Sequence, residues 1–222
     1  MTLAETMKTL ESLGTEQNRK IYRRHGAGDN QFGVSFANLY KLQKQIKSDH
    51  ALAEALWQTG NVDARSLALL IADPRAMTEK QLDAWAGGVT AGGHADLLAR
   101  YVVSASPHAR GRAEAWARSK EEFVGQAGWD VLGILAMKDP SLPDAYFEKY
   151  LVTIEKQIHK AKNRTRYAMN GALIGIGMRN AKLRKLALAA AARIGKVVVD
   201  HGETNCKTPD AAAYIRKSAA RR

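Results

Sequence analysis

Residues 180–196 read NAKLRKLALAAAARIGK, an unbroken run of good helix formers with two different faces. Apolar side chains recur at helical intervals and are predicted to point inward: Leu183, Leu186, Ala190 and Ile194. Basic side chains fall on another face: Lys182, Lys185, Arg193 and Lys196. This stretch therefore predicts an amphipathic helix that packs on a core and presents positive charge away from it.

Similar patterns recur along the whole chain, and strand-like runs are nearly absent apart from Val197-Val198-Val199. Helices are predicted over residues 3–13, 15–25, 35–47, 50–58, 62–72, 78–87, 94–104, 107–118, 119–138, 143–162, 165–178 and 180–196. Short connections and helix pairs at roughly forty-residue spacing predict an all-α, HEAT-like superhelix. A closed helical bundle is the alternative. We expect one domain over residues 1–222, in which residues 197–222 form a C-terminal turn and capping helix.

The helix predicted after Ser35, its expected N-cap, illustrates the assignment of faces. One apolar stripe is expected to be buried: Phe36, Leu39, Leu42 and Ile46. Lys41 and Lys44 lie off that stripe. They form either a solvated face or a surface for DNA.

Positive charge is concentrated at the end of the chain. Residues 156–222, here called the basic third, hold 16 of the 34 Lys and Arg residues but 3 of the 22 Asp and Glu residues. The preceding residues carry 18 basic and 19 acidic side chains, so the formal charge of +12 comes from the basic third. Such a charge favours an anionic partner such as nucleic acid, with a basic but unspecific surface as the alternative.

The segment Lys162-Asn163-Arg164-Thr165-Arg166 lies where two predicted helices meet. Basic side chains and free backbone amides at a helix N-terminus can both bind phosphate. In the preceding helix, one stripe is expected to be buried: Leu151, Ile154, Ile158 and Ala161. Lys160 is then directed away from the core, so this junction is a predicted phosphate-binding surface.

Several other kinds of site are not supported. The single cysteine, Cys206, excludes an internal disulfide, and the spacing of His201 and its acidic neighbours matches no zinc pattern. The alternative is a structural turn before a last helix with Thr208 as N-cap. No apolar run approaches the ~20 residues of a membrane span. The start of the chain lacks the regions of a signal peptide, so we expect a cytoplasmic protein without membrane contact.

Gly171, Gly175 and Gly177 lie within a predicted helix, whereas a dinucleotide-binding loop follows a strand. Close helix packing is therefore the expected role of these glycines. The four tryptophans also fall at helical positions and are expected in the core: Trp57, Trp85, Trp116 and Trp129.

Three stretches together resemble the DNA alkylation repair (AlkD-like) family. They are Tyr22 with Gln31-Phe32-Gly33-Val34, the segment from Asn61 to Ala68, and Glu114-Ala115-Trp116-Ala117-Arg118-Ser119. The resemblance covers most of residues 17–180. It implies a HEAT-like superhelix whose basic concave face holds duplex DNA, and excision of cationic N3- and N7-alkylated purines in the active members.

The resemblance also implies positions for the site. The essential aspartate of the family matches Asp96, where a carboxylate can stabilise positive charge that develops on the sugar. A cleft aromatic matches Tyr22. Three other positions depart from the pattern, because two family tryptophans fall on Gly92 and Gly171 and the supporting arginine falls on Gln126. Gln126 supplies no fixed charge and glycine supplies no aromatic face.

The expected function is therefore binding of double-stranded, alkylated or distorted DNA by a candidate glycosylase with Asp96 as its catalytic residue. The predicted DNA contacts are Tyr22, Lys41, Lys44, Arg65, Gln126, Lys160, Arg164, Arg166, Arg179, Lys182 and Lys185. A non-catalytic DNA binder and a protein-interaction solenoid are the alternatives. Hydrolysis of cationic adducts needs no metal or organic cofactor, so none is predicted, and a monomer is expected.

Overall fold

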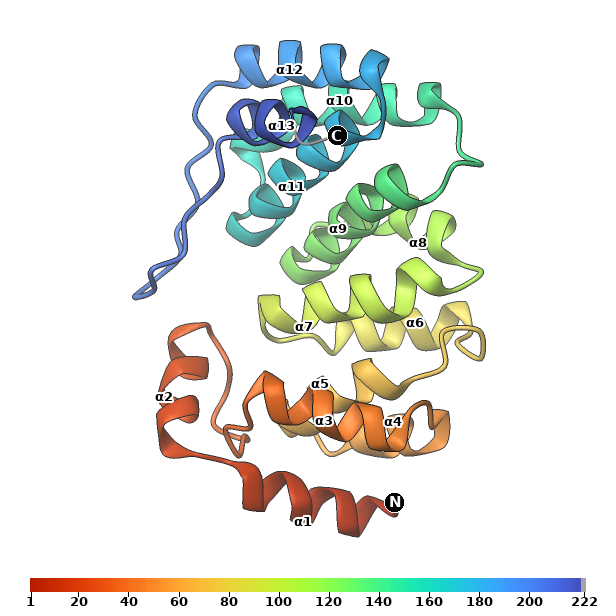
Figure 1. The fold of residues 1–222 in the computed structure, drawn as a ribbon, viewed down its shortest axis with the longest axis vertical. Helices are drawn as coiled ribbons and strands as arrows, with labels where there is room; N and C mark the ends of the chain where they lie inside the picture. Colours follow the sequence, from red (N-terminus) through yellow and green to blue (C-terminus); the bar gives the residue numbers. More distant parts are fainter. Residues whose placement is uncertain (221–222) are drawn as a thin grey trace. The chain divides into compact units, whose positions relative to one another are not determined.

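The structure, a computed structural model, describes residues 1–220, so the last two arginines of the basic third lie outside the described residues. This part of the chain contains thirteen α-helices, two 3-10 turns, one π-helical turn and a single isolated bridge between Gly14 and Val34 (Figure 1). The prediction of an all-α fold is confirmed. None of the helices in residues 1–220 has both the length and the apolar character needed to cross a membrane.

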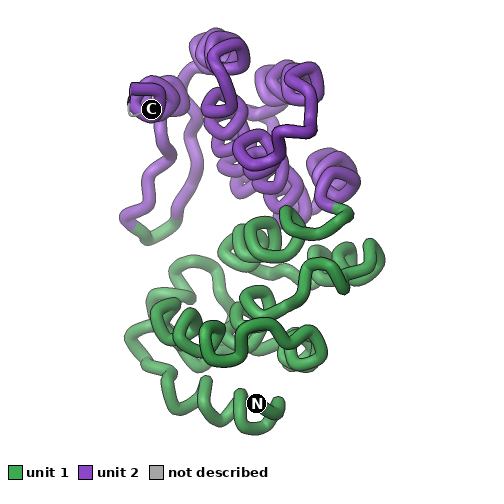
Figure 2. Tube along the Cα trace, turned by 45° about the vertical axis from the view of Figure 1, so that its right-hand side comes forward, with its two compact units in different colours: residues 1–108, 202–204 green, residues 109–201, 205–222 purple. Residues whose placement is uncertain are grey.

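The chain divides into two compact units (Figure 2). Unit 1 comprises residues 1–108 and 202–204, and unit 2 comprises residues 109–201 and 205–222. Each unit is described separately below. The single domain over residues 1–222 stays a prediction.

Unit 1 holds the first seven helices: α1 (Leu3–Leu13), α2 (Glu16–Arg24), α3 (Phe36–Ile46), α4 (His50–Gln58), α5 (Val62–Ile71), α6 (Glu79–Gly87) and α7 (Gly92–Leu97). The last helix continues into the π-helical turn η1 (Leu98–Val102) and the 3-10 turn η2 (Val103–Ala105). Helix α5 lies at the centre, because it packs against α3, α4 and α7. Trp57 and Trp85 stack in this core with ring centroids 4.6 Å apart.

Unit 2 holds the other six helices: α8 (Ala109–Trp116), α9 (Glu122–Lys138), α10 (Asp144–Gln157), α11 (Asn163–Arg179), α12 (Ala181–Ile194) and α13 (Ala211–Ala219). A 3-10 turn, η3 (Ile158–Lys160), extends α10. The long helices α9 and α11 pack along each other, α8 packs on α9, and α12 packs on α10 and α11. Trp116 and Trp129 are at most 4% exposed, like the two tryptophans of unit 1, so the prediction of four core tryptophans is confirmed.

The crossing of α9 and α11 depends on glycine. A Cβ atom on Gly175 would lie 2.7 Å from the carbonyl oxygen of Gly133, closer than atoms can pack. A Cβ atom on Gly177 would lie 2.6 Å from the side chain of Ile215. The expected close packing is confirmed for these two glycines but is wrong for Gly171, whose surroundings are open.

Local signals placed several helix starts correctly. Ser35 and Thr78 accept hydrogen bonds from backbone N–H groups in the first turns of α3 and α6, as N-caps do. The prediction of Thr208 as the last N-cap is wrong. Asp210 caps α13 by accepting a bond from the N–H of Ala213, while the Thr208 hydroxyl lies 2.9 Å from Nε2 of His201.

Two predicted buried residues face solvent. Leu186 is 38% exposed because the small side chain of Ala187, not that of Leu186, points into the packed face of α12. Phe36 is 39% exposed because Leu39 and Leu42 carry the buried face of α3. Phe36 lies instead on the face of Tyr40, one turn further along the helix.

Candidate nucleic-acid interface

Tyr22 is fixed in unit 1 through a buried carboxylate. Asp63, which is 1% exposed at the start of α5, accepts hydrogen bonds from the N–H groups of Phe32, Gly33 and Val34 at 2.6, 2.9 and 2.8 Å. The carbonyl of Val34 then accepts a 2.6 Å hydrogen bond from the Tyr22 hydroxyl. Burial and, to a lesser extent, the charge of Asp63 raise the pKa of Tyr22 to about 12, so the phenol stays a neutral donor.

Asp96 lies on α7 with its side chain exposed. Two residues earlier, His94 is 4% exposed, and its Nε2 atom lies 3.0 Å from both the Ser66 hydroxyl and the Val62 carbonyl oxygen. Burial lowers the pKa of His94, so the ring is neutral when it anchors α7 to α5. Asp96 is therefore an exposed carboxylate on a helix that the buried His94 side chain holds against α5.

The predicted cations of unit 1 divide into two kinds. The guanidinium of Arg65 donates to the carbonyls of Trp57 and Gly88 at 3.2 and 3.0 Å, and it lies 4.8 Å from the Trp57 ring centroid. Lys41 and Lys44 are exposed on α3 and form no ion pair among residues 1–220. The two lysines are available to an anionic ligand, whereas Arg65 holds the fold together.

The helix junction before α11 is more occupied than the sequence predicted. The N–H of Arg164 donates to a carboxylate oxygen of Glu122 at 2.7 Å, so this amide is not free. The guanidinium of Arg166 donates to the carbonyls of Val198 and Ala161, both at 2.9 Å. The Arg164 side chain lies 5.2 Å from the ring centroid of Tyr167. Internal contacts therefore use part of this predicted phosphate site.

Further along the basic third, Arg179 is buried in protein contacts. Its guanidinium donates to three carbonyl oxygens at 2.6 to 2.9 Å, and 12% of the side chain is exposed. Lys182 forms a 2.7 Å ion pair with Glu148. Lys160 and Lys185 are exposed and form no ion pair among the residues described. The lysines, more than the arginines, present free charge.

Gln126 is fully buried in α9, with no exposed surface. Its side chain therefore does not reach the surface of the protein, where the predicted DNA contact would have to be made. Gly171 is exposed on α11, and a Cβ atom there would meet nothing within 4 Å. The surface at Gly171 has room for a larger side chain, whereas Gln126 does not substitute for a surface arginine.

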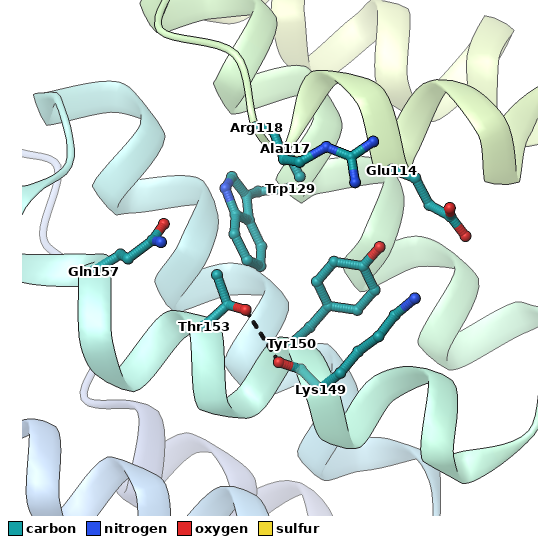
Figure 3. A pocket seen from close by; sticks show the side chains of 8 residues that line it. All are labelled: Glu114, Ala117, Arg118, Trp129, Lys149, Tyr150, Thr153 and Gln157. Carbon is teal, nitrogen blue, oxygen red and sulfur yellow. Dashed lines mark hydrogen bonds between the residues drawn. The ribbon is translucent and has the colours of Figure 1, made fainter.

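A pocket of about 390 Å³ opens within unit 2 between α8, α9 and α10 (Figure 3). The buried ring of Trp129 and the ring of Tyr150 line it, together with Glu114, Arg118 and Lys149. Partial burial acts to raise the pKa of Glu114. A hydrogen bond from Arg110 and the charge of Lys149 outweigh this effect, so the pKa is lowered. The pocket combines aromatic surface with charge of both signs, and none of the predicted DNA contacts lines it.

Four rings in unit 1, here called the aromatic row, lie together, and the sequence did not predict three of them as site residues: Tyr22 is joined by Phe36, Tyr40 and Tyr101. Only Tyr22 was predicted as a site residue. The available signal was the four-residue spacing of Phe36, Tyr40 and Lys44, which places two aromatics and a cation on one helical face. The pocket has a similar signal, because its lining residues Tyr150, Thr153 and Gln157 recur at helical intervals.

No group of three or more His, Cys, Asp or Glu side chains in residues 1–220 is arranged to hold a metal ion. The imidazole of His201 packs edge to face with the ring of Tyr167, with centroids 5.5 Å apart. These contacts give the turn before α13 a structural account.

Comparison with known proteins connects this geometry to a family. The family model described as "DNA alkylation repair enzyme" matches residues 6–215. Two similar relatives are Lin0241 of Listeria innocua and Lmo0209 of Listeria monocytogenes. Each is 33% identical over 218 residues, which cover 96% of this chain and 95% of the relative.

A solved structure extends the comparison to the fold. It is described as belonging to "a new family of proteins related to the HEAT-like repeat DNA glycosylases with affinity for branched DNA structures". The TM-score is 0.90 at 32% identity, and the match covers 100% of this chain and 95% of the other. The prediction of a HEAT-like repeat fold is confirmed.

Proposed function

Because the chain belongs to the DNA alkylation repair enzyme family, we propose that it binds DNA and prefers branched or distorted duplexes. The structural relative with affinity for branched DNA supports the preference, since it is similar over the whole chain. Recognition of DNA shape does not require contacts to base edges, but it does require cations that contact the phosphates.

The observation that carries the proposal is that four of the predicted DNA contacts are exposed lysines without an ion pair in residues 1–220: Lys41, Lys44, Lys160 and Lys185. They lie on α3, η3 and α12, away from the buried faces of these elements. If these lysines served only solubility, the protein should not distinguish a DNA junction from a duplex.

The test compares a four-way DNA junction with a linear duplex of the same base composition, by fluorescence anisotropy with the full chain. We expect tighter binding to the junction. Lys185→Ala should weaken binding to both, whereas Lys182→Ala, one turn away, should weaken it less because Glu148 already neutralises Lys182. Equal affinity for junction and duplex would remove the branched-DNA preference.

Base excision is the second candidate function, and the exposed carboxylate of Asp96 on α7 favours it. A carboxylate near the sugar stabilises the cationic transition state of glycosidic cleavage. Against it, the position of the family arginine holds the buried, uncharged Gln126. Release of base from DNA with N7-methylguanine or N3-methyladenine, by wild type and by Asp96→Asn, decides this role. Release that Asp96→Asn leaves unchanged would exclude Asp96 from catalysis.

A further inference from the structure

The aromatic row joins three elements of unit 1 into one line of rings. The rings of Tyr22 on α2 and Phe36 on α3 meet edge to face, with centroids 6.4 Å apart and planes at 72°. Phe36 and Tyr40 follow at 6.2 Å and 42°. The Tyr40 hydroxyl lies 3.2 Å from that of Tyr101 in η1. The fold thus brings together rings that are far apart in sequence.

The middle of this row is not core. Phe36 is 39% exposed and Tyr40 is 37% exposed, while Leu39 and Leu42 on the same helix are at most 4% exposed. Single exposed apolar residues are ordinary, but a contiguous group of exposed rings marks an interaction surface. Leu39 and Leu42 already form the buried face of α3, so core packing alone does not explain aromatic rings at these two exposed positions.

The surroundings of the row define the chemistry of its ligand. Lys41 and Lys44 follow on α3, which contains no acidic residue, and the Arg100 guanidinium lies 5.5 Å from the Tyr101 ring centroid. The ligand should therefore offer flat apolar faces and negative charge together. Nucleotides of a single strand have this combination, since bases stack on aromatic rings while cations follow the phosphates.

We propose that the aromatic row stacks unpaired nucleobases and so gives the protein a preference for DNA with single-stranded segments. In a continuous duplex the faces of the bases are covered by neighbouring base pairs, whereas a gap, fork or branch exposes them. This inference rests on the proposed DNA binding and deepens it, because it names the part of a branched substrate that unit 1 recognises.

The experiment uses the full chain and two DNA substrates of identical sequence: a continuous duplex, and the same duplex with a short gap in one strand. A 2-aminopurine base, placed in the unpaired segment of the intact strand opposite the gap, reports stacking by its fluorescence. We expect the wild type to bind the gapped DNA more tightly and to change the fluorescence of 2-aminopurine. The double variant Phe36→Ala with Tyr40→Ala should lose about tenfold or more on gapped DNA and less than about twofold on the duplex.

Two control variants separate stacking from general effects. Phe36→Leu keeps apolar bulk and the packing of α3 but has no ring, so it should still weaken binding to gapped DNA and not to the duplex. Tyr214→Ala removes a more accessible tyrosine, 49% exposed on α13 in unit 2, and should leave the gap preference unchanged.

The outcomes distinguish this inference from the proposed function. If the double variant keeps the preference for gapped DNA, the proposed role of the aromatic row is wrong, while binding to duplex and junction still supports the proposed function. Equal losses on gapped and continuous DNA would also overturn it, since stacking acts on unpaired bases. Absence of binding to every DNA at low salt would overturn both.

Discussion

The basic third and the aromatic row differ in how much of their chemistry reaches solvent. In the basic third, guanidinium groups are used within the protein: Arg166 and Arg179 donate to carbonyls, and Arg193 pairs with Glu155 at 2.7 Å. The aromatic row lies in the unit with little net charge, yet its central rings are more than a third exposed. Charge content alone therefore overstates the free cationic surface of unit 2 and overlooks the exposed aromatic surface proposed for unit 1.

The difference follows from the chemistry of the side chains. A planar guanidinium with five donors satisfies several carbonyl oxygens at helix ends, so arginine is readily used as a structural crosslink. An ammonium on a flexible stem keeps its head in water, which leaves lysine available for phosphate. We expect stability to depend on the arginines of the basic third and affinity to depend on its lysines.

Arg179→Ala tests the structural half of this comparison and should have the largest effect. Loss of the donor leaves three backbone carbonyls at the α9–α10 connection unpaired: Ala136, Asp139 and Leu142. We expect the free energy of unfolding to fall by about 3 kcal/mol in urea titrations. Lys185→Ala, the exposed control, should stay within about 0.5 kcal/mol. Equal stability of the two variants would contradict the division.

Replacing both Lys160 and Lys185 by alanine tests the other half. Each phosphate contact contributes about 0.9 to the slope of log affinity against log salt, so the slope should shrink by about two. Unfolding in urea should be nearly unchanged. An unchanged slope would show that the exposed lysines do not meet phosphate, and the basic third would then lose its assigned role.

Acid should destabilise unit 1 before unit 2. His94 is buried and its pKa is lowered, so the unfolded state binds a proton that the folded state excludes. Stability therefore falls as the pH drops below the unfolded value of about 6.5, by at most about 1.4 kcal/mol per pH unit. Hydrogen exchange of amides in α5 and α7 at pH 7.5 and 5.5 measures this. Identical pH dependence in His94→Gln would assign the acid sensitivity to other groups.

Tyr40→Phe should have the smallest effect. It removes an exposed hydroxyl pair with Tyr101 and keeps the ring, so stability should change by less than about 0.5 kcal/mol. Affinity for gapped DNA should stay within about twofold, because stacking uses the face of the ring. A loss as large as that of Tyr40→Ala would show that the hydroxyl, not the ring face, contacts the ligand.

Much of the fold could be predicted because its signals are local. The N-caps Ser35 and Thr78 and the breaks at Gly87 and Asp139 mark helix ends within a few residues of sequence. The buried face of a helix was harder to predict where apolar residues lie on more than one face. Ala187 is buried while the larger Leu186 is exposed, and Phe36 is also exposed. Periodicity alone does not identify the buried face in these helices, because it depends on which other helix packs against them.

The site was less predictable for the same physical reason. Whether a cation is free depends on carbonyls and carboxylates from distant segments, such as the 2.7 Å contact of Glu122 with the Arg164 amide, 42 residues apart. The aromatic row likewise combines α2 and α3 with η1, and Tyr40 and Tyr101 are 61 residues apart in the sequence. Family resemblance supplied Asp96 and Tyr22, and their roles stay predictions.

The most direct test of DNA binding is the salt dependence of the affinity for a four-way junction and for a matched duplex, between 50 and 200 mM, roughly the range over which counterion release is measured. The account predicts a steep negative log–log slope for both and tighter binding to the junction throughout. A flat slope, or no binding to either DNA at the lowest salt, would contradict it.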